Sequence, residues 1–309
     1  MTGSTPVLFV HGLWIHASAW HPWVEYFSAA GYDPSAPGWP GDLETVEATR
    51  ADPSGLDDVG IEAICRHYAG IIEASGTRPI VIGHSFGGLI AQELLAHGFA
   101  TAAVAIDPAP IKGVKILPFA QLRAGLPVLG NPANRKRTVA LTAKQFRYAF
   151  GNAIPEDESD ALFEAWTIPG PGRPLFEDAT ANFVKDSPAT IDTHAAERGP
   201  LLLVSGTEDH TVPRSVTVAV AKLYEGGPST TDYREFAGRG HSLTIDSGWR
   251  DIADSALAWL QEQGLHAGAV GTGAAGTDAA GTDTAATDAA GTGAAGTTTG
   301  SSSASAASD

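Results

Sequence analysis

The chain has 309 residues, a formal net charge of −16 at pH 7 and one cysteine, Cys65. An acidic chain repels phosphate backbones, so we expect no nucleic acid among its partners, and a lone cysteine excludes an internal disulfide and any cysteine-rich metal site. Because no apolar stretch has the length of a membrane span and no signal-peptide pattern is found, we expect a cytoplasmic protein that does not bind a membrane.

Short apolar runs alternate with longer helical stretches from the beginning of the chain. Before Pro108 the sequence predicts strands at 7–10, 80–82 and 102–106 and helices at 23–30 and 89–97. Strands that are apolar on both faces and separated by helices are typical of a parallel sheet covered on both sides. We therefore expect an α/β fold with a mostly parallel, doubly wound sheet.

The segment Gly83-His84-Ser85-Phe86-Gly87 joins a predicted strand to a predicted helix. A Gly-x-Ser-x-Gly pattern in this position is typical of a nucleophile elbow, where the glycines permit a sharp turn that exposes the serine hydroxyl. The alternative is an ordinary glycine-rich turn. We interpret Ser85 as a catalytic nucleophile, because the helix that begins here points its free N–H groups toward negative charge developing beside the serine.

The segment His11-Gly12-Leu13-Trp14 follows the first predicted strand. Gly12 permits a close backbone approach, so we expect the backbone N–H of Leu13 to lie opposite the N–H of Phe86. Two such donors form an oxyanion hole for the tetrahedral intermediate of acyl transfer. On its own the segment would be interpreted as an ordinary strand-to-loop glycine, and the serine motif downstream favours the oxyanion role.

The alternation of strands and helices stops between Pro108 and Gly199, where proline and aromatic residues are frequent. We predict that residues 108–199 form a helical cap above the carboxyl ends of the strands, where open α/β sheets bind ligands. The alternative is that these aromatic side chains form only the core of the insertion. The predicted apolar pocket is lined by Trp14, Ile15, His16, Phe86, Leu117, Phe119 and Trp166. The candidate substrate-binding residues among them are Trp14, His16, Phe119 and Trp166.

After residue 199 the alternation resumes, with predicted strands at 201–204 and 232–236 and helices at 215–223 and 249–263. Because these elements continue the pattern of the first part of the chain, they should complete the same sheet. We therefore expect residues 1–107 and 200–264 to form one core, from which the cap projects.

Two loops of this core carry the candidate acid and base. Asp209 follows the strand at 201–204, where a carboxylate can hold an imidazole and stabilise the imidazolium formed during catalysis. Asp107 emerges at the same edge of the sheet and is the second candidate for the acid. His241 is the candidate base, because the glycines before it let its loop bend toward Ser85.

The other histidines near these motifs, His11, His84 and His210, are expected to have structural or surface roles. No His-Glu-x-x-His pattern and no Cys/His spacing of a zinc site occurs in the sequence. We therefore expect neither a metal nor an organic cofactor.

Residues 265–309 differ in composition from the rest of the chain. From Ala267 onward they are mostly Gly, Ala, Thr, Ser and Asp in imperfect repeats, without an aromatic residue, lysine or arginine. Such a segment buries too little apolar surface to offset the entropy of ordering its backbone, so we predict a disordered tail.

Taken together, the motifs resemble the α/β-hydrolase superfamily over residues 5–264. The resemblance rests on His11-Gly12, Gly83–Gly87, Gly206–Pro213 and Gly240-His241, in the superfamily's order of oxyanion loop, nucleophile, acid and histidine. It implies a serine hydrolase with a Ser85, Asp209 and His241 triad and a helical cap.

The segment from His11 to Trp23 is also similar to the His-Gly-x-x-His-x-x-Trp pattern of small methylesterases and their hydroxynitrile-lyase relatives, with a spacing that departs by one residue. Those lyases carry threonine where this chain has Gly12, and lysine where it has Ser242. The resemblance therefore disfavours the lyase reaction.

The predicted function is hydrolysis of a carboxylic ester or lactone of a small to medium hydrophobic substrate through an acyl-enzyme. The same triad supports other reactions, namely cleavage of thioesters or amides, C–C hydrolysis, a lyase reaction and perhydrolysis. A non-catalytic ligand receptor on the same scaffold is the alternative from another class. The presence of Ser85, Asp209 and His241 together favours the enzyme.

Overall fold

A computed structural model of the chain describes residues 4–268, so the predicted tail beyond residue 268 lies outside the described residues. Six strands form one sheet in the order β2-β1-β3-β4-β7-β8, and every neighbouring pair in it is parallel. The strands are β1 (Pro6–Val10), β2 (Asp33–Ser35), β3 (Ile80–His84), β4 (Ala102–Ile106), β7 (Leu201–Gly206) and β8 (Thr231–Phe236).

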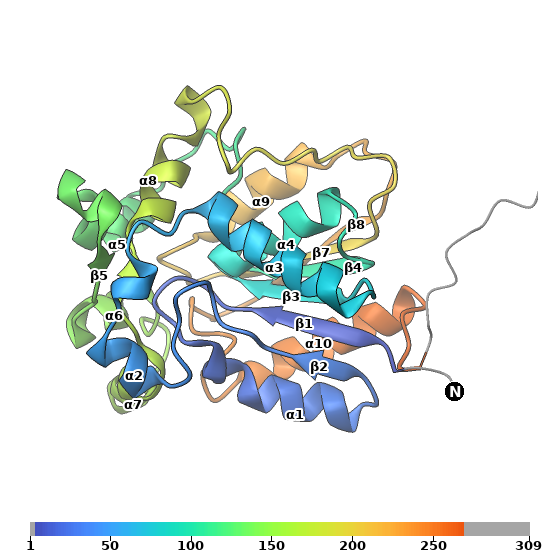
Figure 1. The fold of residues 1–309 in the computed structure, drawn as a ribbon, viewed down its shortest axis with the longest axis horizontal. Helices are drawn as coiled ribbons and strands as arrows, with labels where there is room; N and C mark the ends of the chain where they lie inside the picture. Colours follow the sequence, from blue (N-terminus) through green and yellow to red (C-terminus); the bar gives the residue numbers. More distant parts are fainter. Residues whose placement is uncertain (1–3, 269–309) are drawn as a thin grey trace, which may run out of the picture. The chain divides into compact units, whose positions relative to one another are not determined.

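Helices cover both faces of this sheet (Figure 1). One face packs against α1 (His21–Ala29) and α10 (Trp249–Glu262), and the other against α3 (Ile61–Ser75), α4 (Phe86–Ala96) and α9 (Arg214–Leu223). Side chains alternate along β1, so that Val7 and Phe9 enter one hydrophobic cluster while Leu8 and Val10 enter the other. The fold is therefore the doubly wound α/β architecture that the sequence predicts.

The chain between β4 and β7 is helical and lies beyond the carboxyl ends of the strands (Figure 1). It contains α5 (Phe119–Leu129), α6 (Ala143–Ala149), α7 (Glu156–Trp166), α8 (Arg173–Ala179) and an antiparallel pair, β5 (Thr138–Val139) and β6 (Gly170–Pro171). The short helix α2 (Val46–Ala51) is tied to it, because the Arg50 guanidinium donates to the carbonyl oxygens of Thr167 and Phe163 at 2.7 and 3.0 Å. Four 3-10 helices complete the description: Ala17–Trp20, Ser54–Leu56, Pro132–Lys136 and Ala181–Phe183.

Two elements of the core are not among those predicted. Strand β2 reads Asp-Pro-Ser and carries no apolar signal, and it pairs only with β1 at the edge of the sheet, where proline is tolerated. Helix α3 does carry a signal, because Ile61, Ile64, Tyr68 and Ile72 recur at helical spacing and are all buried. None of the helices in residues 4–268 is both long and apolar enough to cross a membrane.

Candidate active site

Ser85 occupies the tight turn between β3 and α4 in a backbone conformation that is rare for a residue with a side chain, with φ 57° and ψ −122°. The flanking glycines make this turn possible. A Cβ on Gly83 would lie 2.0 Å from the carbonyl oxygen of Gly87, and a Cβ on Gly87 would lie 2.1 Å from that of Val10. The Gly-x-Ser-x-Gly pattern therefore reflects direct contact between backbones on both sides of the serine.

The loop after β1 approaches Ser85 closely. A Cβ on Gly12 would lie 2.7 Å from Ser85 Cβ, so only glycine fits at this point and the following residue, Leu13, is held beside the serine. At the start of α4 the N–H groups of Gly88 and Leu89 donate to Ser85 O at 2.9 and 3.2 Å. Phe86 is the first residue of this helix, so its N–H has no acceptor within the helix. The loop after β1 and the start of α4 thus both lie against the hydroxyl-bearing residue.

Asp209 and His241 are joined by a buried hydrogen bond, in which His241 Nδ1 donates to Asp209 Oδ2 at 2.6 Å. The other carboxylate oxygen accepts from the backbone N–H groups of Thr211 and Val212 at 2.6 and 2.8 Å. Burial acts to raise the pKa of Asp209, but the charge and hydrogen bond of His241, together with the other hydrogen bonds, hold it below its usual value. Asp209 is therefore a carboxylate that orients the imidazole.

The second nitrogen of His241 has no hydrogen-bond partner within residues 4–268, and it is fully buried. No hydrogen bond joins Ser85 Oγ to His241 Nε2 in this part of the chain. The two residues nevertheless lie in one region, because His84, next to the serine, has its ring centroid 4.5 Å from that of His241. With Nδ1 donating to Asp209, Nε2 has the free lone pair of a proton acceptor, and such contacts often tighten only when substrate binds.

Asp107 forms a second acidic contact in the same place. Its Oδ2 lies 4.0 Å from His241 Nδ1 and has no hydrogen-bond partner among the described residues, while its Oδ1 accepts from the N–H of Gly206 at 2.8 Å. Burial and then the charge of Asp209 raise the pKa of Asp107 well above its usual value. The hydrogen bond to His241 therefore belongs to Asp209, whereas Asp107 is a buried carboxyl group whose surroundings favour its protonated form.

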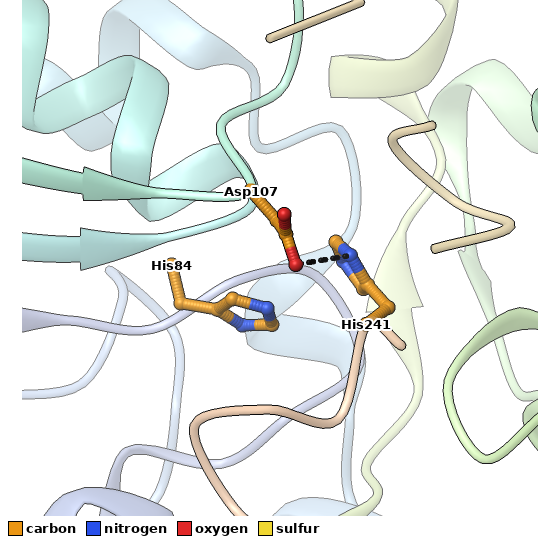
Figure 2. A group of neighbouring side chains, drawn as sticks. All are labelled: His84, Asp107 and His241. Carbon is orange, nitrogen blue, oxygen red and sulfur yellow. Dashed lines mark ion pairs between the residues drawn. The ribbon is translucent and has the colours of Figure 1, made fainter. Parts of the chain in front are cut away.

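Figure 2 shows Asp107 and His241 facing one another, with the His84 ring beside them. All three are buried, and each offers an atom within 4.8 Å of the others, so this group has the composition of a cation site. Burial lowers the pKa of His84 well below its usual value, so its imidazole is neutral. Because His241 is already engaged by Asp209, a cation here would compete with the acid–histidine contact.

An apolar pocket of about 330 Å³ opens beside Ser85. It lies between the core and the helical segment that follows β4. The loop after β1, the start of α4, the segment before α5, and the helices α5 and α8 all contribute to its lining, which includes Trp14, Phe86, Leu117 and Leu175. A pocket of this size and lining suits a small apolar ligand.

The structure brings only part of the predicted pocket together. Trp14, Phe86 and Leu117 line it, whereas Ile15, His16, Phe119 and Trp166 do not. His16 instead caps a 3-10 helix and lines a separate pocket, and Phe119 is 78% exposed. The backbones of His16 and Trp166 do meet, since His16 N donates to Trp166 O at 3.0 Å, so this pair connects the loop after β1 to the helical segment.

Most of the residues that line the pocket are not among those predicted, and two of them, Gln121 and Asp178, are polar side chains without a hydrogen-bond partner among the described residues. They lie on different helices, and no motif links them, so the sequence contains no signal that would have found them. Among the competing histidines, His11 is buried, with Nε2 2.9 Å from Asp42 Oδ2, and stacks on Trp39. His11 therefore has a structural role in the loop that carries Leu13.

Comparisons with known proteins agree with this fold. A model of the alpha/beta hydrolase family matches residues 7–256, while no curated protein matches the chain. Among solved structures, the chain is similar to a Paleococcus ferrophilus monoacylglycerol lipase, with 23% identity, a TM-score of 0.57 and coverage of 84% of this chain and 94% of that one. It is also similar to a pyrethroid hydrolase from Sphingobium faniae, with 19% identity, a TM-score of 0.59 and coverage of 84% of this chain and 97% of that one. A third similar structure is a putative non-heme bromoperoxidase from Mycobacterium tuberculosis, with 20% identity, a TM-score of 0.60 and coverage of 84% of this chain and 93% of that one.

Proposed function

The chain belongs to the alpha/beta hydrolase family, and on that premise we propose that it is a serine hydrolase that cleaves a carboxylic ester or lactone of a small to medium hydrophobic substrate. One observation carries the proposal. Ser85, strained at its turn, lines an apolar pocket beside a buried histidine whose Nδ1 is held by Asp209 at 2.6 Å. This arrangement joins a nucleophile, a base and an orienting acid.

In the proposed mechanism, Ser85 Oγ attacks the substrate carbonyl carbon and transfers its proton to His241 Nε2. The carbonyl oxygen becomes an oxyanion that accepts hydrogen bonds from the backbone N–H groups of Leu13 and Phe86. His241 then gives the proton to the departing alcohol, which leaves an acyl-enzyme. In the second half His241 takes a proton from water, the hydroxide attacks the acyl carbon, and Ser85 recovers its proton.

The pocket supports an apolar substrate. Besides its aliphatic lining, four of its residues are large hydrophobic side chains that are also exposed at the surface, namely Ile116, Leu117, Leu122 and Phe183. Exposed apolar side chains at the mouth of the pocket favour the binding of an apolar substrate, because both surfaces are removed from water. Two similar structures are named a monoacylglycerol lipase and a pyrethroid hydrolase, and both names are those of hydrolases.

A chromogenic ester tests the proposal. Wild type should hydrolyse p-nitrophenyl butanoate, and Ser85→Ala should reduce kcat/KM by about a thousandfold or more. Ser28→Ala, an exposed serine of α1, is the matched control and should keep the wild-type rate. Equal rates for wild type and Ser85→Ala would refute the proposal that the protein is a serine hydrolase with Ser85 as its nucleophile. Tight binding of an apolar ligand without any turnover would support the receptor alternative instead.

A further inference from the structure

The pocket beside Ser85 contains a few polar side chains in an otherwise apolar lining. Apart from Ser85 itself and the Trp14 indole, they are Lys115, Gln121, Asp178, Asn182 and Thr211. Both ends of the Asn182 amide have a partner, because its oxygen accepts from Gly113 N at 2.8 Å and its nitrogen donates to Val114 O at 2.6 Å. Thr211 Oγ1 donates to Ala149 O at 2.7 Å, and Lys115 is exposed to water at the rim.

Gln121 and Asp178 remain without a partner. The Gln121 Oε1 atom is buried, and neither its amide nor the Asp178 carboxyl group makes a hydrogen bond or ion pair within residues 4–268. Protein surrounds Asp178, yet the side chain keeps some exposure, as expected of a group that faces a cavity. Gln121 lies on α5 and Asp178 on α8, and these two helices pack against one another.

Polar groups without partners destabilise a fold when they lie in an apolar environment. Where a chain keeps two of them in the pocket that also holds the nucleophile, a bound ligand is the natural source of the missing hydrogen bonds. Gln121 and Asp178 are therefore candidates for recognising a polar group of the substrate away from the reacting carbonyl.

The chemistry of the two side chains identifies that group. Burial raises the pKa of Asp178 to about 8, so at neutral pH its carboxyl group can both donate and accept a hydrogen bond. The amide of Gln121 can also do both. A hydroxyl group matches this pair, because it donates one hydrogen bond and accepts another without bringing charge into the pocket. A ligand carboxylate has only Lys115 to pair with, at the exposed rim.

We propose that the substrate is an apolar ester with a hydroxyl group remote from the scissile carbonyl, and that Gln121 and Asp178 bind this hydroxyl. The inference rests on the proposed ester hydrolysis, since it adds a specificity site to the same pocket. Gln121 and Asp178 act on recognition of the substrate and not on its chemistry.

Paired esters test the inference by turnover. Wild type should prefer p-nitrophenyl 6-hydroxyhexanoate over p-nitrophenyl hexanoate by about tenfold in kcat/KM, the effect of about one to two hydrogen bonds. Asp178→Leu and Gln121→Leu should each reduce this preference to about threefold or less, where the preference is the ratio of the two kcat/KM values measured on the same variant. Asp160→Leu and Gln261→Leu, at exposed positions of α7 and α10, are the matched controls and should keep the wild-type preference.

A binding measurement separates failure of this inference from failure of the proposed function. In the Ser85→Ala background, methyl 6-hydroxyhexanoate should raise the Tm more than methyl hexanoate does, and Asp178→Leu should abolish the difference. If wild type hydrolyses the esters no faster than Ser85→Ala, the proposed hydrolase function is refuted, but the difference in Tm still tests the hydroxyl site. Equal binding and equal turnover of the two esters would overturn the hydroxyl site. Preference for the 6-aminohexanoate ester over the hydroxy ester would also overturn it, since the site would then select a cation.

Discussion

Replacing Gly87 by alanine should disrupt the nucleophile elbow. The added Cβ would lie 2.1 Å from the carbonyl oxygen of Val10 and 2.7 Å from that of His11, well inside an ordinary contact of about 3.4 Å. Both oxygens belong to backbone, and Val10 is the last residue of a strand paired inside the sheet, so neither can move cheaply. We expect Gly87→Ala to reduce the free energy of unfolding by about 3 kcal/mol or more and to abolish ester hydrolysis.

Gly70 provides the matched control. It lies within α3, and a Cβ there would meet nothing within 4 Å, so Gly70→Ala should raise the free energy of unfolding by about 0.5–1 kcal/mol. Urea unfolding followed by circular dichroism, together with kcat/KM on p-nitrophenyl butanoate, measures both variants. If Gly87→Ala unfolded at the same urea concentration as wild type, the reasoning from backbone contact would be wrong.

Three further predictions concern the site. Asp209→Asn should lower kcat/KM by about a thousandfold to ten-thousandfold, because it removes the hydrogen bond that holds the imidazole. Asp107→Asn, which changes a carboxyl group 4.0 Å from the same nitrogen, should cost less than about tenfold; similar losses in the two variants would contradict the assignment of the acid. Gly12→Ala places a Cβ 2.7 Å from Ser85 Cβ and should lower kcat by about tenfold or more, which steady-state kinetics would show, whereas an unchanged kcat would argue against the oxyanion role of this loop. For Asp178, the folded-state pKa of about 8 lies above the unfolded value of about 3.9, so the folded state binds the extra proton and wild type loses stability as pH rises between these values. Asp178→Asn removes that dependence, so its free energy of unfolding relative to wild type should rise by about 3–4 kcal/mol between pH 5 and pH 8, measured by urea unfolding; parallel stability curves would refute it.

Much of the core could be predicted from short stretches of sequence. The apolar runs at 80–82, 102–106 and 201–204 correspond to β3, β4 and β7, because a strand buried on both faces needs consecutive apolar residues. Strand β2 could not be predicted in this way, because it contains no run of apolar residues. It lies at the edge of the sheet, and its Asp-Pro-Ser sequence owes its extended form to pairing with β1.

The sequence by itself determined the elbow and the positions of Ser85, Asp209 and His241 after predicted strands. Tight turns require glycine at particular neighbouring positions and buried strands require runs of apolar residues, so both can be recognised in short stretches of sequence. The tertiary structure alone decided which carboxylate bonds to the imidazole, with Asp209 at 2.6 Å and Asp107 at 4.0 Å from His241 Nδ1. It also decided the pocket, which Gln121 lines while Phe119, two residues earlier, is exposed. Which side chains a helix turns toward a cavity depends on its packing against distant elements, and no local pattern encodes that rotation.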